Sequence, residues 1–473
     1  MKVNCFVEKN PIVETLIQHL ARSPQTFQPH IAVADEMFLY QLDELDDRNF
    51  DQALVNYYSL GRTLFDSIQQ IINWYFGSFE RISSFLDFAC GYGRFMRFLV
   101  QEMPTEKIWA SDIYAEAVKF QTEYFGVHGI VSTRNPEDYQ VEQKFDCVYA
   151  GSFFSHMPPR TFSLWMQKLY HLLNSQGLLI FSVLDETTLL PFTPMSADGI
   201  LFSSKDSETQ LLDRNDYGTT YVTETFIREL IDKISQNRAA IYRIKKGLGN
   251  YQDLYVVTPQ PNQDFTRLNF KYHPEGYLDH CNVTPTGEIQ LAGWAIDSNP
   301  NGCVEMVQIL VNNEVIHQCQ PSKERPDLVE YFQSSQAGHS GWSCSINSGT
   351  VTPPDIVLIK AINTAKLEWI IAVETVKNLM FRTRWREELA TTRSQLKQRE
   401  TQLEKTQSQL EFAELTLAQA RDKLTKLETE LGSCQFFLEQ STHEIQAIKS
   451  SKFWKIRIQW VQLRQALERF VKK

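Results

Sequence analysis

A short strand that turns through small residues into a helix constrains this chain more than any other feature. Residues 83–97 read SSFLDFACGYGRFMR, so an apolar run is followed by Ala89, Gly91 and Gly93 and then by a second apolar stretch. Glycines let the backbone approach a bound molecule closely, and the first N–H groups of a following helix attract a carboxylate or phosphate. Asp87 could accept a hydrogen bond from an ammonium or hydroxyl group of the same molecule. The stretch therefore predicts a ligand-binding loop.

The spacing of the glycines separates two nucleotide-like ligands. A dinucleotide fingerprint needs a third glycine three residues after the second, and here that position is Met96. The remaining pattern, DxACGxG, resembles motif I of class I S-adenosylmethionine-dependent methyltransferases, with alanine where that family usually has its first glycine. Taken alone, the motif also fits a generic glycine turn of an α/β domain. The resemblance implies cofactor contacts from Asp87, Ala89, Cys90, Gly91 and Gly93.

Strands and helices alternate after this loop, which requires parallel strands joined by right-handed crossovers. The sequence therefore predicts an α/β fold with a Rossmann-like methyltransferase sheet. Strands are expected at 85–88, 107–111, 129–132, 145–150 and 177–183. Helices are expected from the glycine turn to about 103, at 115–124, and from after the prolines at 158–159 to an end in 172–176. A helix at 224–234 and strands at 240–246 and 253–257 would complete the sheet, with the antiparallel last strand of the family.

Two further strand ends suit the same ligand. Asp112 ends the second strand, about 20 residues past the glycine turn, where a carboxylate is placed to bind both ribose hydroxyls of an adenosine. The alternative is that Asp112 caps the helix that follows. The resemblance also implies contacts from Ile113 and from Gly151 and Ser152 after the fourth strand. Open sheets bind ligands at the carboxyl ends of adjacent strands, where all three loops are expected. The resemblance therefore implies S-adenosylmethionine as the cofactor.

Methyl transfer from a sulfonium requires an aligned acceptor, exclusion of water and, for a hydroxyl acceptor, a base. His156 follows the fourth-strand loop and is the best-placed imidazole for that base, with a structural role as the alternative. In the family, segments between the last strands usually form the acceptor pocket, although ordinary packing explains the same residue types. The candidate acceptor contacts are Tyr217, Tyr221, Tyr251, Gln252 and Asp253.

Residues 1–80 are expected to form an N-terminal helical cap, and residues 81–260 the S-adenosylmethionine-binding methyltransferase domain. The last helix of the cap has one apolar face, which predicts packing on the sheet. In similar methyltransferases such a helix also closes over the cofactor. That role would fall to Tyr57, Tyr58 or Arg62.

Residues 264–376 read as a small β-sandwich accessory domain, with short alternating stretches between turn residues. The stretches lie at 288–295, 305–312, 315–320, 341–346 and 356–362. The motifs GWAxD from Gly293, RPD from Arg325 and SGW from Ser340 resemble an accessory β-domain of bacterial methyltransferases and glycosyltransferases from surface-polysaccharide clusters. That resemblance implies a sugar or glycan acceptor and a glycosyltransferase partner. Trp294 and Trp342 belong either to the core or to an aromatic carbohydrate-binding face.

An unbroken heptad repeat follows. The repeated positions are Leu389, Leu396, Leu403, Leu410, Leu417, Leu424, Leu431, Leu438 and Ile445. This period predicts a coiled coil at 380–449, and therefore a homo-oligomer, because a single helix cannot hide such a stripe. The companion positions are poor in large apolar groups at first, so the pairing should be tighter towards the C-terminal half. Dimer and trimer both fit the pattern.

Residues 450–473 are expected to form a basic amphipathic helix in which Glu468 is the only acid. On a chain with a net charge of −10, such a tail suits peripheral contact with an anionic membrane surface. Closure of the coiled coil is the alternative.

Composition limits the partners, the location and the metal sites that the chain is expected to have. The acidic balance gives no reason to expect a nucleic-acid partner. No apolar run approaches the roughly 20 residues of a membrane span, and the N-terminus lacks a basic and then apolar signal, so we expect a cytoplasmic protein, peripheral at the inner membrane face if the tail binds lipid. The eight cysteines include no C-x-x-C pair, so no metal site is expected. The alternative to an enzyme is a non-catalytic coiled-coil scaffold that recruits glycosyltransferases at the membrane surface.

Overall fold

The structure is a computed structural model that describes residues 5–6, 10–45, 49–189, 193–204, 215–284, 288–299, 302–347, 351–352 and 354–471. The chain divides into one compact unit at residues 1–384 and a second at residues 385–473. Each unit is described by itself.

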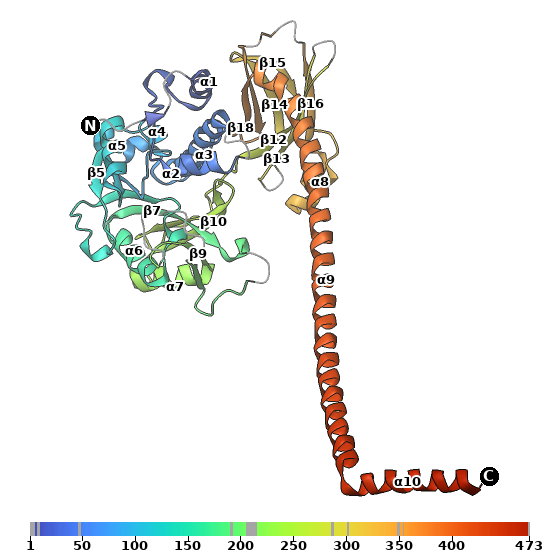
Figure 1. Cartoon of the computed structure of the whole chain (residues 1–473). Coiled ribbons are helices and arrows are strands. Elements are labelled where there is room, and N and C mark those ends of the chain that lie inside the picture. The colour runs from blue at the N-terminus through green and yellow to red at the C-terminus, as the bar shows by residue number, and fades with distance from the viewer. Residues whose placement is uncertain are drawn as a thin grey trace. The chain divides into compact units, whose positions relative to one another are not determined.

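A nine-stranded mixed sheet lies at the centre of the methyltransferase-like part of the first unit (Figure 1). Its main path runs in the order β10, β11, β7, β6, β3, β4, β5, with parallel pairing from β7 to β5 and antiparallel pairing of β11 with β7 and β10. The expected parallel sheet with an antiparallel last strand is thereby confirmed. The strands are β3 (Phe85–Phe88), β4 (Ile108–Asp112), β5 (His128–Val131), β6 (Phe145–Ala150), β7 (Leu173–Asp185), β8 (Ile200–Ser203), β9 (Thr219–Val222), β10 (Ala240–Leu248) and β11 (Gln252–Thr258).

Helices cover both faces of this sheet because successive strand residues point to opposite sides. Phe85 of β3 packs in a core with Ile68 of the N-terminal helices, whereas the next residue, Leu86, packs in a second core with Trp165 and Ile231. The helices that follow the strands are α4 (Met96–Leu99), α5 (Ala115–Phe125), α6 (Pro159–His171) and α7 (Glu224–Ser235). Short 3-10 helices connect these elements: η2 (Phe79–Arg81), η3 (Thr105–Lys107), η4 (Pro136–Asp138), η5 (Phe154–His156) and η6 (Glu186–Thr188).

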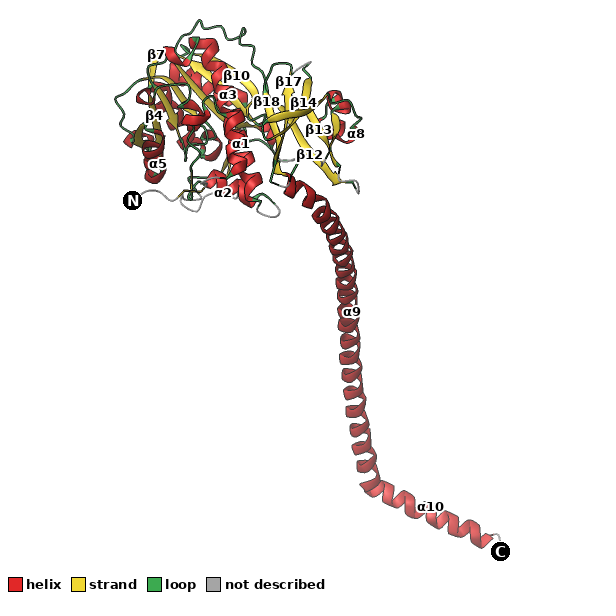
Figure 2. Ribbon diagram, turned by 90° about the horizontal axis from the view of Figure 1, so that it is seen from above, coloured by secondary structure: helices red, strands yellow, loops and turns green. Residues whose placement is uncertain are grey.

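The N-terminal helices lie between the large sheet and the later β-strands (Figure 2). One continuous core contains Leu16 and Ile68 from these helices and also Leu358 and Val373 from the β-domain. The backbone of Lys271 exchanges two hydrogen bonds with the Gln70 side chain, at 2.8 and 3.0 Å. The expected cap is therefore packed on two sides. Its elements are β1 (Cys5–Phe6), α1 (Pro11–Leu20), η1 (Pro24–Thr26), β2 (Ile31–Ala32), α2 (Glu36–Asp43) and α3 (Phe50–Phe76).

In the large sheet and its helices, two boundaries differ from the sequence expectation by four residues, and the others that differ do so by less. The helix after the glycine turn ends at Leu99 and not near Met103. Met103 itself precedes Pro104, and a residue before proline avoids the helical region. Tighter turns continue the chain there, with Gln101 N–H donating to Phe98 O. The fifth parallel strand begins at Leu173 and not Gly177, since Leu173 already pairs with β6 before an irregularity in the register.

The β-domain consists of two antiparallel sheets that share one hydrophobic core. Trp342 is buried in this core, whereas Trp294 packs against Phe332, with ring centroids 5.4 Å apart. The sheets are β12 (Pro274–Val283), β13 (Ile289–Asp297) and β16 (Gly341–Ile346), and β15 (Glu314–Cys319), β14 (Val304–Val311), β17 (Ile356–Asn363) and β18 (Glu368–Thr375), with helices α8 (Pro326–Phe332) and η7 (Ser335–His339). The sequence interpretation missed β12 and β18.

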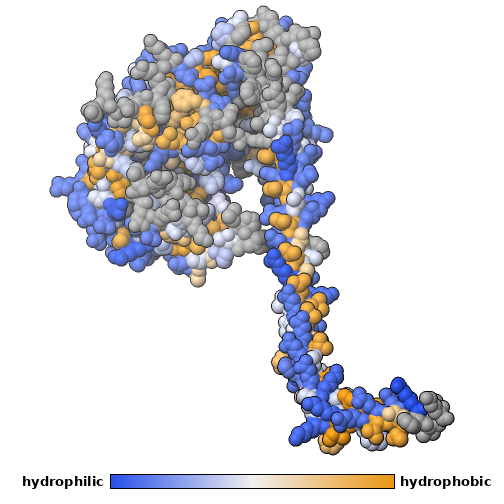
Figure 3. Space-filling view, in the orientation of Figure 1, coloured by the Kyte–Doolittle hydropathy of each residue, from blue (hydrophilic) through white to orange (hydrophobic). Residues whose placement is uncertain are grey.

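The second unit is helical. Helix α9 (Val376–Ser450) begins in the first unit and supplies most of the second, and α10 (Lys452–Val471) follows it. The heptad leucines that the structure describes from Leu396 to Leu438 are exposed, and apolar groups recur along the helix surface (Figure 3). A long helix is thus confirmed, while its pairing stays a prediction. None of the helices in the described ranges combines the length and apolar character that a bilayer span requires.

Candidate active site

The glycine loop after β3 has three residues, at alternate positions, with the positive φ of the left-handed backbone region. The φ angles are +58° at Ala89, +50° at Gly91 and +85° at Gly93. Glycine adopts this region freely, but alanine does so at a cost because of its Cβ. The loop therefore has the glycine-type conformation at all three motif positions, including the one occupied by Ala89.

Two buried polar side chains hold this loop. Gln121 of α5 donates from Nε2 to the carbonyls of Cys90 and Gly91, at 3.2 and 3.0 Å. Arg97 donates from Nε to the carbonyl of Gly93, at 3.0 Å. Sequence reasoning missed both residues. A glutamine or an arginine on an otherwise apolar helix face indicates a buried polar contact and could have pointed to them. They fix the loop shape from the side of the core.

The open side of the loop lies at Gly91. A Cβ added to Gly91 would meet no atom of the described chain within 4 Å, whereas one added to Gly93 would come within 2.4 Å of the Phe125 ring. Position 93 therefore requires glycine, because any side chain there would clash with Phe125 of α5. Gly91 instead exposes backbone to open space, where a bound molecule could approach it.

Asp87 presents a carboxylate without a partner beneath this loop. Its Oδ2 is buried and has no hydrogen-bond partner among the described residues. Burial, and then the negative charge of Asp112, raise the pKa of Asp87 well above its ordinary value. A buried acceptor with no donor is costly, so the site suits a ligand that supplies an N–H or O–H group.

Asp112 joins the glycine loop to the start of α5. Its Oδ2 accepts from Gly91 N–H at 2.9 Å and its Oδ1 from Tyr114 N–H at 3.0 Å. Burial raises the pKa of Asp112, and these backbone N–H groups with that of Ile113 oppose the shift. Tyr114, and not Asp112, occupies the N-cap position of α5. A carboxylate has about four acceptor positions, so capacity remains for a ligand hydroxyl.

The third loop tip, after β6, carries a polar cluster. Ser152 has φ +54° and donates from its backbone N–H to Ser182 Oγ at 2.7 Å. The hydroxyls of Ser152 and Ser182 both donate to Gln252 Oε1, at 3.1 and 2.6 Å. The structure thus brings together Ser152, expected near the cofactor, and Gln252, expected near the acceptor. Sequence reasoning missed Ser182, which sits inside an apolar strand.

His156 and Tyr217 meet beside this tip, although 61 positions separate them in sequence. Their rings are stacked, with centroids 4.8 Å apart and planes 11° apart. His156 Nδ1 lies 2.9 Å from Gly218 O, and Gly218 N–H donates to His156 O at 2.9 Å. Because a carbonyl only accepts, Nδ1 carries the proton, and Nε2 is the basic nitrogen of the neutral ring. Tyr221 lies further along, in β9, opposite Leu184.

The remaining acceptor candidates have different surroundings. Asp253 is buried and pairs with Arg243 at 2.6 Å, and its Oδ1 accepts from Lys246 N–H. Arg243 also pairs with Asp185 at 2.7 Å and Glu224 at 2.8 Å. The contacts of Asp253 are therefore those of a structural ion-pair cluster that ties β10, β11, β7 and α7 together. Tyr251 is exposed in the turn that precedes β11.

The three N-terminal candidates are held by protein groups. The Tyr57 hydroxyl donates to Asp35 Oδ2 at 2.5 Å, and that of Tyr58 donates to Pro29 O. Arg62 pairs with Asp66 at 2.7 Å. These contacts fit the packing interpretation of this helix.

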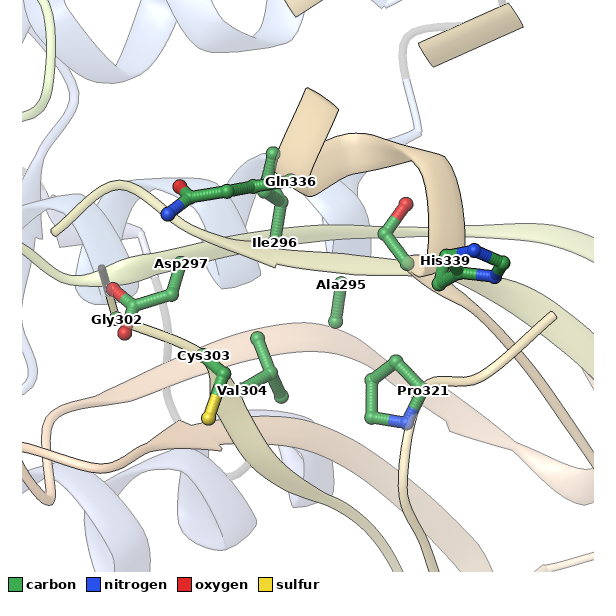
Figure 4. Close-up of a pocket in the computed structure, with 10 residues that line it drawn as sticks. Ala295, Ile296, Asp297, Gly302, Cys303, Val304, Pro321, Gln336 and His339 are labelled. Atoms are coloured by element: carbon green, nitrogen blue, oxygen red, sulfur yellow. The ribbon is translucent and has the colours of Figure 1, made fainter. Parts of the chain in front are cut away.

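A small cavity in the β-domain lies apart from these loops (Figure 4). Its volume is about 90 Å³, below the range of roughly 300 to 1,000 Å³ of usual ligand pockets. Asp297 contributes a buried Oδ2 without a partner in the described chain, but a Cβ on Gly302 would lie only 2.4 Å from it, so that oxygen faces backbone. The described residues contain no His, Cys, Asp and Glu cluster suited to a metal ion.

Residues 86–179 match the model of a family described as a methyltransferase domain. No curated protein matches this chain. A solved S-adenosylmethionine-dependent methyltransferase from Clostridium acetobutylicum ATCC 824 is similar at 14% identity and a TM-score of 0.32, over 47% of this chain and 97% of its own. Streptomyces venezuelae DesVI is similar at 12% identity and a TM-score of 0.32, over 44% of this chain and 98% of its own.

These structural likenesses are too distant to decide anything about the chemistry, and the family match stands without them. It covers β3 from Leu86 onward with the glycine loop, Asp112, and the β6 loop with His156. The orphaned Asp87 carboxylate suits an ammonium group, and the remaining acceptor positions of Asp112 suit a ligand hydroxyl near the open backbone at Gly91. Residues 86–179 therefore match a methyltransferase domain, and the site geometry suits S-adenosylmethionine as its cofactor.

Proposed function

We propose that this chain transfers a methyl group to a hydroxyl of a sugar or glycan acceptor. The observation that carries the cofactor half is the buried Asp87 Oδ2, which has no partner in the described chain and lies beneath a loop with an open backbone at Gly91. S-adenosylmethionine, when bound, supplies an electrophilic methyl group on a sulfonium. Asp87 would accept from its ammonium group, Asp112 from its ribose hydroxyls, and the backbone near Gly91 would border it.

The acceptor half rests on the polar cluster at the β6 tip. Gln252 Oε1 is held by the Ser152 and Ser182 hydroxyls, which turns the amide NH₂ away from them. That NH₂ group would donate to an acceptor oxygen and orient it. His156 Nε2 would take the hydroxyl proton, because Nδ1 is fixed as a donor to Gly218 O. Positioning and proton removal are the two tasks that this reaction asks of protein side chains.

The sugar or glycan class rests on the resemblance of the β-domain motifs to accessory domains of surface-polysaccharide enzymes. The same resemblance favours a glycosyltransferase partner. The exposed heptad stripe of α9 supports homo-oligomer formation, because leucines spaced in this way are stable only when covered. A non-catalytic scaffold is the second candidate, and the same stripe favours it equally.

Calorimetric titration with S-adenosylmethionine separates the two candidates. We expect the intact chain to bind, and Asp112→Ala to weaken binding about ten- to a hundred-fold through loss of charge-assisted hydrogen bonds. Glu116→Ala, an exposed acid in the first turn of α5, is the matched control and should bind normally. Absence of binding by the intact chain would favour the scaffold.

The acceptor is best found by mass-shift screening of sugar nucleotides and oligosaccharides with the intact chain. On a positive acceptor, Gln252→Ala should raise KM by loss of the orienting donor. His156→Gln should lower kcat, because Nε2 is no longer present to take the hydroxyl proton. Methylation of peptides or small amines in place of sugars would leave the enzyme assignment intact and reject the acceptor class.

A further inference from the structure

Helix α10 carries an apolar stripe that the described chain does not cover. Its members are spaced three and four residues apart, which places them on one face of the helix. Their exposed fractions run from 58% to 89%: Phe453, Ile456, Trp460, Leu463 and Leu467. Apolar groups gather along α10 in the space-filling view (Figure 3). Such a surface needs a partner.

Basic residues outnumber acids in α10. Five basic residues and one acid lie within α10, on a chain whose net charge is −10. Arg457 and Arg464 flank the stripe on one side and Lys452 on the other, by their helical positions. Glu468, the single acid, pairs with Arg464 at 3.1 Å. The face around the stripe therefore attracts an anionic surface.

Self-pairing of α10 is opposed by these charges. If Phe453 and Ile456 are taken as the a and d positions of a coiled coil, Lys452 falls at g and Arg457 at e. Two parallel copies would set Lys452 against Arg457, and two antiparallel copies would bring the arginines at e together. Both arrangements place like charges next to each other. A second copy of α10 is therefore a less favoured partner for the apolar stripe.

The stripe of α10 is also out of register with that of α9. Seven residues after Ile445 comes Lys452, whereas the α10 stripe begins at Phe453. The helix is interrupted at Ser451, between the end of α9 and the start of α10. The α10 stripe therefore does not prolong the seam of α9, and the two helices can bury their apolar faces in different surroundings.

We propose that α10 lies flat on the surface of an anionic lipid bilayer, with its apolar stripe among the upper acyl chains and its arginines and lysines at the headgroups. Aromatic and leucine side chains opposite cationic ones are the composition of interfacial helices. Long basic side chains reach headgroups while their stems cover apolar surface. This proposal is independent of methyl transfer.

Flotation of the full chain with vesicles tests it. We expect binding to vesicles of 70% phosphatidylcholine and 30% phosphatidylglycerol, little binding to pure phosphatidylcholine, and weaker binding in 500 mM than in 50 mM salt, because screening removes the electrostatic part. Arg457→Gln with Arg464→Gln should weaken partitioning by about five-fold per charge. Trp460→Ser with Leu463→Ser should abolish it.

Ile458→Ser is the matched control, since Ile458 lies on another side of the same helix and should leave binding unchanged. Circular dichroism and the unfolding midpoint show whether each variant still folds. Failure of the intact chain to float with the anionic vesicles overturns the proposal. So does Trp460→Ser with Leu463→Ser if it lowers the oligomer mass by light scattering while leaving vesicle binding intact, because the stripe then serves a helix partner.

Discussion

Ala89 occupies a backbone conformation that residues with a Cβ avoid. Its φ of +58° is the left-handed value, which costs an L-residue roughly 1–2 kcal/mol. The sequence comparison of motif positions identified Ala89 as a substitute for glycine, and the structure confirms the glycine-type conformation there. The residue is therefore a local source of strain in the cofactor loop.

Ala89→Gly should raise the free energy of unfolding by about 1 kcal/mol, because glycine adopts the same φ without a Cβ clash. Urea unfolding followed by circular dichroism measures the change. Ala110→Gly in β4 is the control, where φ is ordinary and the loss of a buried methyl should destabilise. A fall in stability for Ala89→Gly would show that the methyl packs favourably enough to outweigh the strain.

Asp87→Asn should stabilise the cofactor-free protein at pH 7.5 by about 1–3 kcal/mol, because it removes a buried carboxylate that lacks a donor. Burial raises the pKa of Asp87 in the folded chain above its ordinary value of 3.8. The folded state therefore loses stability relative to the unfolded state as pH rises above 3.8 and the carboxyl ionises. The gain should therefore shrink as pH falls towards 3.8.

The same variant should bind S-adenosylmethionine more weakly, since the amide no longer offers an anionic acceptor. Unfolding at pH 7.5 and pH 4 and calorimetric titration provide the two measurements. A variant that is less stable at both pH values would show that another group already satisfies Asp87.

At the scale of elements, the order and pairing of strands were predictable and several side-chain roles were not. Alternating apolar runs and turn residues located β3, β6 and α7 closely. Asp253 was expected in an acceptor pocket, but its partner Arg243 lies ten residues upstream and meets it only through antiparallel pairing. The spacing of residues along the sequence does not predict such a cross-strand contact. Gln121 was missed for the same reason, because its function is to support a loop 30 residues away.

Arg243→Met should lower the free energy of unfolding by about 3–5 kcal/mol, because it leaves carboxylates of three elements without their shared cation. Hydrogen bonding from Arg243 also lowers the pKa of Glu224, so part of this support is lost on acidification. Urea unfolding at pH 7.5 tests the change. Arg228→Met, on the exposed side of α7, should cost less than about 1 kcal/mol. Equal effects of the two variants would refute the role of the cluster.

At the scale of the whole molecule, the described leucines of α9 form an apolar stripe with no cover of its own. Their period was the clearest pattern in the sequence, and it predicts association between chains because only a second helix of the same period fits it. The number of chains depends on packing at positions where this sequence mixes Thr, Arg, Ala and Leu, so the repeat alone leaves it open.

Leu410→Asp with Leu417→Asp should convert the oligomer to monomers, because buried charges at two successive seam positions cannot be solvated. Sedimentation equilibrium or light scattering gives the mass. Gln419→Asp adds a charge away from the seam and should leave the mass unchanged. A monomeric intact chain would contradict the prediction, whereas unchanged S-adenosylmethionine binding in the double variant is expected.

Arg97 links the glycine loop to the chain that precedes the sheet. Its buried guanidinium donates to the carbonyls of Gln28 and His30 and to the Tyr57 hydroxyl, and it stacks over the Tyr57 and Tyr58 rings. Without this N-terminal segment, Arg97 would keep, among the described residues, only the Gly93 carbonyl as a hydrogen-bond acceptor. The shape of the glycine loop therefore depends on the chain that precedes the sheet, because one buried cation is shared between them.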